Sequence, residues 1–393
     1  MEKRKRILDW FIEAIQIFLQ WLLTKPLKWL AGKFASAPKK DRVIKSLSEL
    51  YDEVTSNPGK KGMLYTFNPA IQPVIIFSDE HKGARNGSDI FAASEKNYSA
   101  ALEYYNNHQF FFINLGDCEE LWQNTIFRLL RKNKKVFEVE KLFVRRKAYY
   151  KIFGNHDLFW DNTPLSQVFL KRMYGEVIRV FACVVMRMQL STTDHIDIFC
   201  THGHQGDSQA DGNAFAKWVV SYVWGPISAF LHINPNTPST NDNRKTLHNM
   251  YMYEWSKEQE NVILITGHTH QPVFNSVTHL EHLYLLLEEA HRANDAEEIA
   301  RIEAEIPRRK REYDFVNNSF RNMKPSYFNS GCCCFDDGTI TGIEIANGFI
   351  RLVKWKKGPE GPVRVVAEEV ELDELAVRFE TYKEAEDAAK MVT

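Results

Sequence analysis

The chain has 393 residues, with 50 basic and 51 acidic side chains and a formal net charge of −1. Hydrophobic residues make up 44% and charged residues 26%, which are ordinary globular values and exclude a wholly disordered or collagen-like chain. The near-zero net charge gives no general attraction for nucleic acid, so we expect no nucleic-acid partner. Six cysteines are too few for a disulfide scaffold in a chain of this length, and they favour a reducing, cytoplasmic compartment.

The N-terminal segment is unusually apolar. Between residues 7 and 23, the polar side chains Asp9, Glu13, Gln16 and Gln20 recur at steps of four, three and four, which places them on one stripe of a helix. The rest of the helix surface would carry apolar side chains, Trp10 and Trp21 among them, and Lys and Arg flank the segment on both sides. This pattern predicts an amphipathic helix within residues 1–40 that lies on a membrane surface through residues 7–30, as a peripheral anchor.

Three other interpretations of this segment stay open. A transmembrane span needs about 20 apolar residues and no polar stripe. A signal peptide fits the basic start, but Asp9 and Glu13 fall inside its apolar region. The helix could also pack on the core of its own chain or on a second subunit.

From residue 74 onward, the chain contains short, wholly apolar runs, which are typical of strands that are buried on both faces. Stretches long enough for crossover helices lie between them, so the sequence predicts a layered α/β fold. The five runs that end in polar clusters are residues 74–77, 110–115, 148–153, 196–200 and 262–265.

We expect one catalytic domain over residues 41–371, followed by an acidic C-terminal segment at 372–393. Two insertions interrupt the domain. The insertion at 205–258 is rich in Trp and predicts helices on both sides of an Asn/Pro/Thr-rich middle, whereas the insertion at 280–313 predicts a helical hairpin that packs or makes a homo-oligomer. Asn347-Gly348 predicts a type I′ turn between two late strands.

Each of the five apolar runs ends in residues that suit metal binding. Six of the thirteen histidines lie in these short clusters. In α/β sheets, ligands bind beyond the carboxyl ends of the strands, so we expect the clusters to converge. The clusters are Ser78-Asp-Glu-His-Lys-Gly83, Gly116-Asp-Cys-Glu-Glu120, Gly154-Asn-His-Asp157, Thr201-His-Gly-His204 and Gly267-His-Thr-His270.

The residue types in these clusters define the metal chemistry. Asp79 and His81, like His268 and His270, are two residues apart, so both side chains of each pair would point the same way from extended backbone. Carboxylate, amide and imidazole ligands favour Mn²⁺, Fe or Zn²⁺. Seven such ligands suit two divalent ions about 3.5–4 Å apart, and we expect Mn²⁺ first.

The order of these blocks, Asp-x-His, Gly-Asp, Gly-Asn-His-Asp, His and Gly-His-x-His over residues 78–270, resembles the signature of the calcineurin-like metallophosphoesterase superfamily. The resemblance implies a four-layer α/β/β/α sandwich with a dinuclear metal site. It also implies which residues hold the ions: Asp79, His81 and His270 for one, Asn155, His202 and His268 for the other, and Asp117 as the bridge.

The resemblance further implies that His156 donates a proton to the leaving oxygen and that Asp157 orients its ring, as an imidazole held by a carboxylate can do. Arg85 and His204 lie close enough to the motifs in sequence to contact the substrate phosphate. We expect the three consecutive cysteines at 332–334, and also Cys118, to be packing residues of the hydrophobic core.

Protein Ser/Thr phosphatases of this fold carry Arg after the second block and Glu at the end of the third, whereas this chain has Glu119-Glu-Leu-Trp122 and Asp157. The second block and the insertion after the fourth are loosely similar to the UDP-diacylglucosamine pyrophosphatase branch. This chain departs from that branch in having His156 where the branch usually has Arg.

The sequence therefore predicts a metal-dependent phosphoric ester hydrolase in which a metal-bridging hydroxide attacks a lipid-linked or nucleotide-containing phosphoester. One alternative is a cytosolic phosphodiesterase or phosphomonoesterase that acts on soluble nucleotides. Another is a non-catalytic scaffold that the first helix recruits to membranes.

Overall fold

The computed structural model describes residues 39–85, 89–121, 124, 126–161, 164–189, 195–206, 242–309 and 323–392. The predicted N-terminal amphipathic helix and most of the insertion at 205–258 lie outside these residues. Among the helices that the structure describes, none is long and apolar enough to cross a lipid bilayer.

Two seven-stranded sheets form the centre of the described chain. The first sheet contains, in spatial order, β1 (Gly62–Phe67), β6 (Cys183–Gln189), β7 (His195–Thr201), β8 (Val262–Thr266), β11 (Tyr327–Asn329), β9 (Val273–Phe274) and β10 (Val277–Thr278). The second sheet contains β14 (Pro362–Glu371), β13 (Phe349–Lys357), β12 (Ile340–Ala346), β2 (Val74–Phe77), β3 (Phe111–Leu115), β4 (Tyr149–Ile152) and β5 (Val180–Phe181).

The five apolar runs that predicted buried strands form β2, β3, β4, β7 and β8, which confirms that part of the sequence analysis. The first three run parallel in the second sheet, while β7 and β8 run parallel in the first. Because both faces of each sheet are covered, their side chains do not alternate between polar and apolar. All four residues of β2 and all five of β8, for example, are buried.

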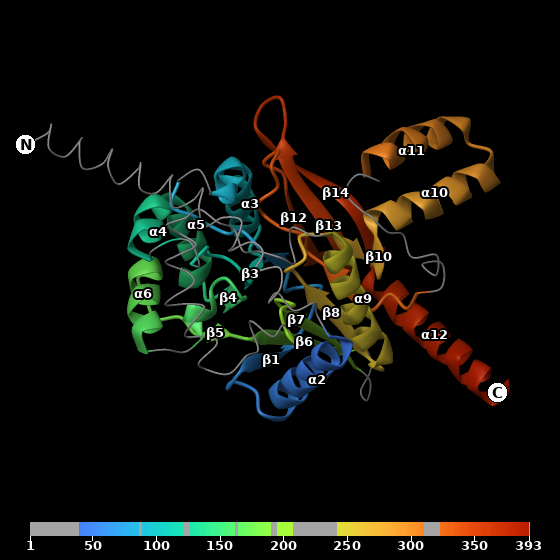
Figure 1. Ribbon diagram of the computed structural model, residues 1–393, viewed down its shortest axis with the longest axis horizontal. Helices are drawn as coiled ribbons and strands as arrows, with labels where there is room; N and C mark the ends of the chain where they lie inside the picture. Colours follow the sequence, from blue (N-terminus) through green and yellow to red (C-terminus); the bar gives the residue numbers. More distant parts are fainter. Residues whose placement is uncertain are drawn as a thin grey trace, which may run out of the picture.

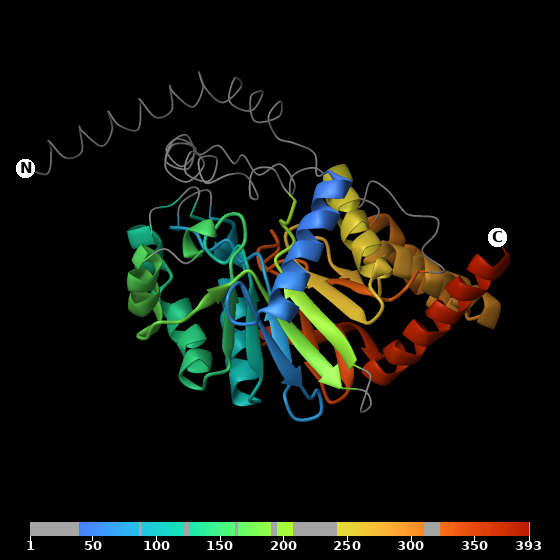
Figure 2. The same cartoon turned by 90° about the horizontal axis from the view of Figure 1, so that it is seen from below.

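Helices cover the outer face of each sheet. On the first sheet lie α2 (Lys40–Ser56) and α9 (Asp242–Glu258), and on the second lie α3 (Glu95–Asn107) and α5 (Lys134–Arg145). Helix α2 has buried residues at steps of four, three and four, Val43, Leu47, Leu50 and Val54, so one stripe of it faces the sheet. Figures 1 and 2 show the two helix groups on opposite sides of the paired sheets.

Three hydrophobic cores separate these four layers. One core lies between the two sheets and contains residues such as Ile76 and Ile113 from the second sheet and Ile198 and Ile263 from the first. The other two lie between each sheet and its helices. The predicted α/β/β/α sandwich is therefore confirmed.

Smaller elements extend the second helical layer. They are η1 (Ile90–Ala93), α4 (Ile126–Lys132), η2 (Leu158–Trp160) and α6 (Pro164–Tyr174). Residues of α4, α5 and α6 share one hydrophobic cluster around the buried Trp160.

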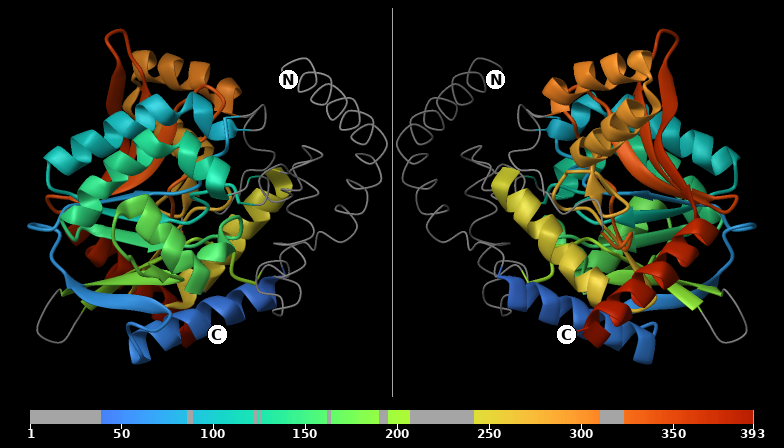
Figure 3. Two further views of the ribbon diagram at one scale, coloured as in Figure 1. Left: turned by 90° about the vertical axis from the view of Figure 1, so that its left-hand side faces the viewer. Right: turned by 90° about the vertical axis from the view of Figure 1, so that its right-hand side faces the viewer.

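The predicted helical hairpin of the second insertion is confirmed as α10 (His279–Ala293) and α11 (Ala296–Arg309). The chain reverses at Asn294, which has a φ of 53°. The two helices share a small core of their own and lie outside the four layers, as Figures 1 and 3 show. Helix α12 (Leu372–Val392) starts on the inter-sheet core through Leu375 and Phe379.

The predicted β-hairpin is also confirmed. Strands β12 and β13 pair antiparallel, with Ala346 opposite Phe349. Asn347 and Gly348 form the turn with φ values of 54° and 80°, the two positive angles that a type I′ turn requires.

Candidate metal centre

The five polar clusters meet at one end of the sandwich, where strands from both sheets end. Asp79 N–H donates to the Gly116 carbonyl at 3.0 Å, which joins the loops after β2 and β3. Gly267 N–H donates to the His202 carbonyl at 3.0 Å, which joins the loops after β8 and β7. The His268 N–H then donates to Asp79 Oδ2 at 2.9 Å and so connects the two sheets.

The backbone of these loops is not extended, contrary to the sequence-based expectation. The five residues Asp79, His81, Asp117, His268 and His270 have φ values of 53°, 48°, 51°, 67° and 60°. Positive φ is uncommon outside glycine and costs free energy, and such residues concentrate at functional sites. The loops turn at these residues, and the side chains are brought together by that turning and not by strand alternation.

Two glycines allow the loops to approach so closely. A Cβ at Gly154 would overlap Asp117 Oδ1, and a Cβ at Gly267 would overlap both Ser78 Oγ and Asp79 Oδ2. Any larger residue at either position would displace a carboxylate of the centre.

One group of ligand atoms gathers around Asp79. Its Oδ1 lies 3.3 Å from His270 Nε2 and 3.8 Å from His81 Nε2. The two imidazole Nε2 atoms lie 3.1 Å apart. These three side chains are the ones predicted to hold one ion, and their ligand atoms lie within 4.8 Å of one another.

A second group gathers around Asp117. His202 Nε2 lies 3.2 Å from Asp117 Oδ2 and 3.3 Å from Asn155 Oδ1. Asp117, His202 and His268 also offer ligand atoms within 4.8 Å of one another. Asp117 Oδ2 is 3.8 Å from His81 Nε2 of the first group, so this carboxylate lies between the two groups, where a bridging ligand is expected.

The donor set fits two divalent cations. The carboxylates of Asp79 and Asp117 are 0% and 2% exposed, and burying two negative charges so close together is costly without compensating positive charge. Lone pairs of oxygen and imidazole nitrogen face one another across each group. These are ligands that Mn²⁺, Fe and Zn²⁺ all accept, so the residues define the site but not the metal.

His156 lies beside the first group, with its ring centroid 4.6 Å from that of His81. Its partner differs from the prediction. Asp157 accepts hydrogen bonds from the backbone N–H groups of Cys118 at 2.9 Å and Gly154 at 2.6 Å, and therefore holds the loops together. The carboxylate on the His156 ring is Glu120, whose Oε2 lies 2.8 Å from His156 Nδ1.

A sequence model described as calcineurin-like phosphoesterase matches residues 72–272, just over half of the chain. The chain belongs to this family. The match covers all five metal-binding clusters, and together with the two groups of ligands it supports metal-dependent phosphoester hydrolysis.

No curated protein matches the chain. Among solved structures, it is similar to vacuolar protein sorting 29 of Cryptosporidium parvum, with 12% identity and a TM-score of 0.33 over 76% of this chain and 98% of the other. It is also similar to a dimetal phosphatase from Danio rerio, with 6% identity and a TM-score of 0.32 over 76% of this chain and 100% of the other.

Further contacts hold the candidate metal-binding side chains of this phosphoesterase-family site in place. His202 Nδ1 lies 2.9 Å from the Leu115 carbonyl, and Asp117 Oδ1 accepts the His156 N–H at 2.7 Å. Glu120 Oε2 also lies 3.2 Å from His81 Nδ1, so one carboxylate contacts both a candidate metal-binding histidine and His156. Such contacts fix the ring orientation and raise the basicity of a metal-binding histidine.

The electrostatics keep Glu120 ionised. Burial raises the pKa of its carboxyl, but the charge of His156 and hydrogen bonds from His156 and His81 outweigh burial and lower that pKa to about 2. Asp157 shows the opposite balance: burial, with the charges of Glu119 and Asp117, raises its pKa to about 6.

Buried ion pairs lie beneath the centre. Glu119 Oε2 accepts hydrogen bonds from Lys151 Nζ at 2.8 Å and from Trp160 Nε1 at 2.8 Å. Lys82 Nζ lies 3.1 Å from Glu140 Oε1 and 3.6 Å from Glu119 Oε1. These ion pairs link the loops after β2 and β3 to β4 and α5.

The two predicted substrate contacts differ in position. His204 is buried, and its ring centroid is 5.4 Å from that of His202, so it lies beside the centre. The Arg85 guanidinium instead contacts Asn133 Oδ1 and Glu95 Oε1, both at 2.9 Å. Arg85 thus fastens its own loop to neighbouring helices, and a role in phosphate binding is not supported.

Two residues near the centre were missed by the sequence analysis. Glu120 belongs to the second cluster, three residues after Asp117, and this position in a metal-binding motif could have indicated that it lies near the centre. His248 gave no motif signal, because it lies on α9; its Nε2 is 2.5 Å from the Gly203 carbonyl and its ring centroid is 5.1 Å from that of His268.

Because Asp117 lies between both groups, the Asp117→Asn substitution should reduce the bound metal from two ions to fewer than one per chain. The check is elemental analysis after dialysis against Mn²⁺. The matched control is Arg85→Ala, which removes a charge outside the centre and should leave both ions in place. Retention of both ions by Asp117→Asn would contradict a bridging role.

The affinity of the metal-free protein for Mn²⁺ should rise with pH. Burial lowers the pKa of His202, but the charges of Asp117 and Asp79 outweigh burial and raise that pKa to about 9. Below pH 9 an incoming ion must therefore displace a proton, and affinity should gain about tenfold per pH unit for each proton displaced. Calorimetric titrations with Mn²⁺ from pH 6 to 9 measure how the affinity changes with pH. An affinity that stays constant over this range would contradict the prediction.

Proposed function

We propose that the protein hydrolyses phosphoric esters at this centre with two divalent ions, Mn²⁺ before Fe or Zn²⁺. The ligands would be Asp79, His81, Asp117, Asn155, His202, His268 and His270. One observation carries the proposal: ligand atoms from five separate clusters converge in two adjoining groups, with His156 beside them. When bound, the ions supply positive charge that stabilises the phosphoryl oxygens in the transition state.

His156 would act as the general acid. Its Nδ1 contacts the ionised Glu120 at 2.8 Å, an arrangement that stabilises the imidazolium and fixes the orientation of the ring. The protonated ring can then donate from Nε2 to the departing oxygen. A departing alkoxide needs that proton far more than a departing nitrophenolate, which is stable as an anion.

We infer a lipid-linked or nucleotide-containing phosphoester as the substrate, at a membrane surface. The amphipathic pattern of residues 7–30 supports this choice, together with the Trp-rich insertion that follows the fourth cluster. Soluble nucleotides are the alternative substrate class, and comparing turnover on detergent-dispersed lipid phosphoesters and cyclic nucleotides separates the two.

The hydrolysis test uses metal-stripped protein refilled with Mn²⁺, assayed on a phosphate monoester and a diester. For His156→Ala we expect a loss of about 10²- to 10⁴-fold in kcat on esters with alkyl leaving groups and a much smaller loss on nitrophenyl esters. The matched control is His108→Ala, an exposed histidine directly after the end of α3, which should leave turnover unchanged. Bound metal without turnover on either ester would contradict the proposal and favour the scaffold alternative.

The membrane part is tested by deleting residues 1–38, which precede α2. The full chain should cosediment with vesicles that contain anionic lipid, and the deletion should abolish this because it removes both the apolar stripe and its flanking charges. Gln16→Ser, a change within the polar stripe, is the control and should bind as the full chain does. Unchanged binding after the deletion would overturn the membrane proposal.

A further inference from the structure

A second cluster of metal-binding atoms adjoins the proposed centre. The loop between β11 and β12 carries Cys332, Cys333 and Cys334, all buried and none in a disulfide. Two hydrogen bonds fix this loop against the first metal-binding cluster and the next strand: Cys333 N–H donates to the Ser78 carbonyl at 3.1 Å, and Cys332 N–H donates to Thr341 Oγ1 at 3.2 Å.

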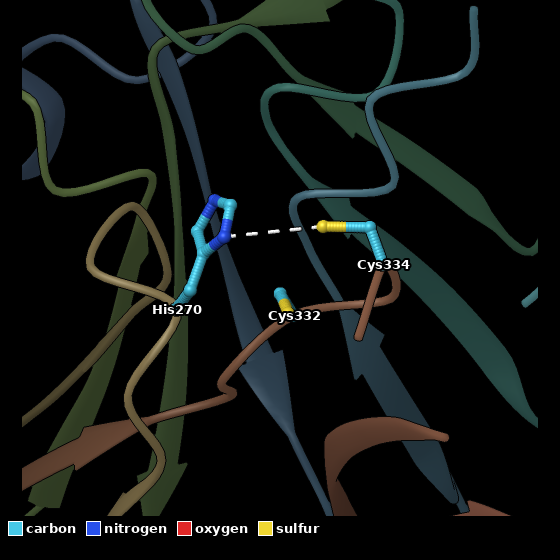
Figure 4. A group of neighbouring side chains, drawn as sticks. All are labelled: His270, Cys332 and Cys334. Atoms are coloured by element: carbon cyan, nitrogen blue, oxygen red, sulfur yellow. Dashed lines mark hydrogen bonds between the residues drawn. The ribbon is translucent and has the colours of Figure 1, made fainter. Parts of the chain in front are cut away.

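The ring of His270 lies between this loop and the proposed ion site. Its Nε2 faces Asp79 and His81, at 3.3 and 3.1 Å. Its other nitrogen, Nδ1, lies 3.9 Å from Cys334 Sγ, and Figure 4 shows that thiol pointing toward the ring with Cys332 on the same loop. The ligand atoms of His270, Cys332 and Cys334 all lie within 4.8 Å of one another.

We infer that His270 Nδ1, Cys332 Sγ and Cys334 Sγ form a third metal position, for a thiophilic divalent ion such as Zn²⁺. Zinc bonds of about 2.0 Å to nitrogen and 2.3 Å to sulfur put tetrahedral ligand atoms roughly 3.6 Å apart. Separations of 3.9 Å and below 4.8 Å need only a small contraction to reach that geometry. Three protein ligands leave the fourth coordination position open to an exogenous group.

This position is distinct from the two proposed catalytic ones. The two nitrogens of one imidazole point away from each other, so ions bound to both lie roughly 6 Å apart. Sulfur ligands also select differently: thiolates favour Zn²⁺, while carboxylates and imidazoles accept Mn²⁺. The third ion would displace two thiol protons and the proton of His270 Nδ1, and the two thiolates would balance its charge.

Metal-free protein titrated with Co²⁺ alone tests this inference without any turnover, so a failure of the hydrolysis proposal does not affect it. Cobalt bound by thiolate gives a sulfur-to-metal charge-transfer absorption in the near ultraviolet, whereas cobalt bound only by oxygen and nitrogen does not. The wild-type chain should take up three Co²⁺ ions and develop this absorption. Uptake of two ions with no such absorption would overturn the inference, whatever the variants do.

Two variants locate the sulfur ligands. Cys332→Ala/Cys334→Ala should lose the absorption and one of the three ions but keep the other two. The matched control is Cys333→Ala, because Cys333 belongs to the core between the second sheet and α3, and this variant should keep all three ions. If the absorption persists in the double variant, the sulfur ligand comes from another cysteine, such as Cys118 beside Glu119 and Asp157, and the inference fails.

Discussion

The site depends on one constraint: two buried aspartates must lie close together at the end of the sandwich. Asp79 follows β2 and Asp117 follows β3, and these strands are hydrogen-bonded neighbours, so their carboxylates cannot separate without breaking the sheet. Histidines from the other sheet face them at 3.2 and 3.3 Å. An arrangement of this kind is costly when empty and favourable when cations fill it, because ions that bind only the folded state also stabilise that state.

Buried ion pairs support the same loops. Lys151 and Lys82 are fully buried and form ion pairs with Glu119 and Glu140, so direct ion pairs anchor the loop after β3 that also carries Asp117. Removing one member of such a buried pair leaves an uncompensated charge. The loop can therefore hold Asp117 at a positive φ of 51°, a conformation that an unsupported loop would relax.

The sequence predicted the features that depend on hydrophobic pattern and residue type. Short apolar runs identified β2, β3, β4, β7 and β8, and the polar residues after them supplied both groups of ligands. It could not predict contacts set by loop conformation: Arg85 contacts Glu95 and Asn133 because its own loop turns toward the helices. The sequence also could not predict that distant segments lie together. His270 and Cys332 are 62 positions apart, and the pairing of β11 with β8 and β9 brings them close.

Glu120, and not Asp157 as predicted, is the carboxylate that contacts the His156 ring. The Asp157 carboxylate accepts hydrogen bonds from the backbone N–H groups of Gly154 in its own loop and of Cys118 in the loop after β3. Glu120 starts on the neighbouring loop, and its extra methylene carries one oxygen to both His156 and His81. A charge that favours protonation of His156 is thereby shared with a histidine predicted to bind metal. In the proposed mechanism, cation binding at His81 and proton donation by His156 would therefore be coupled through the same carboxylate.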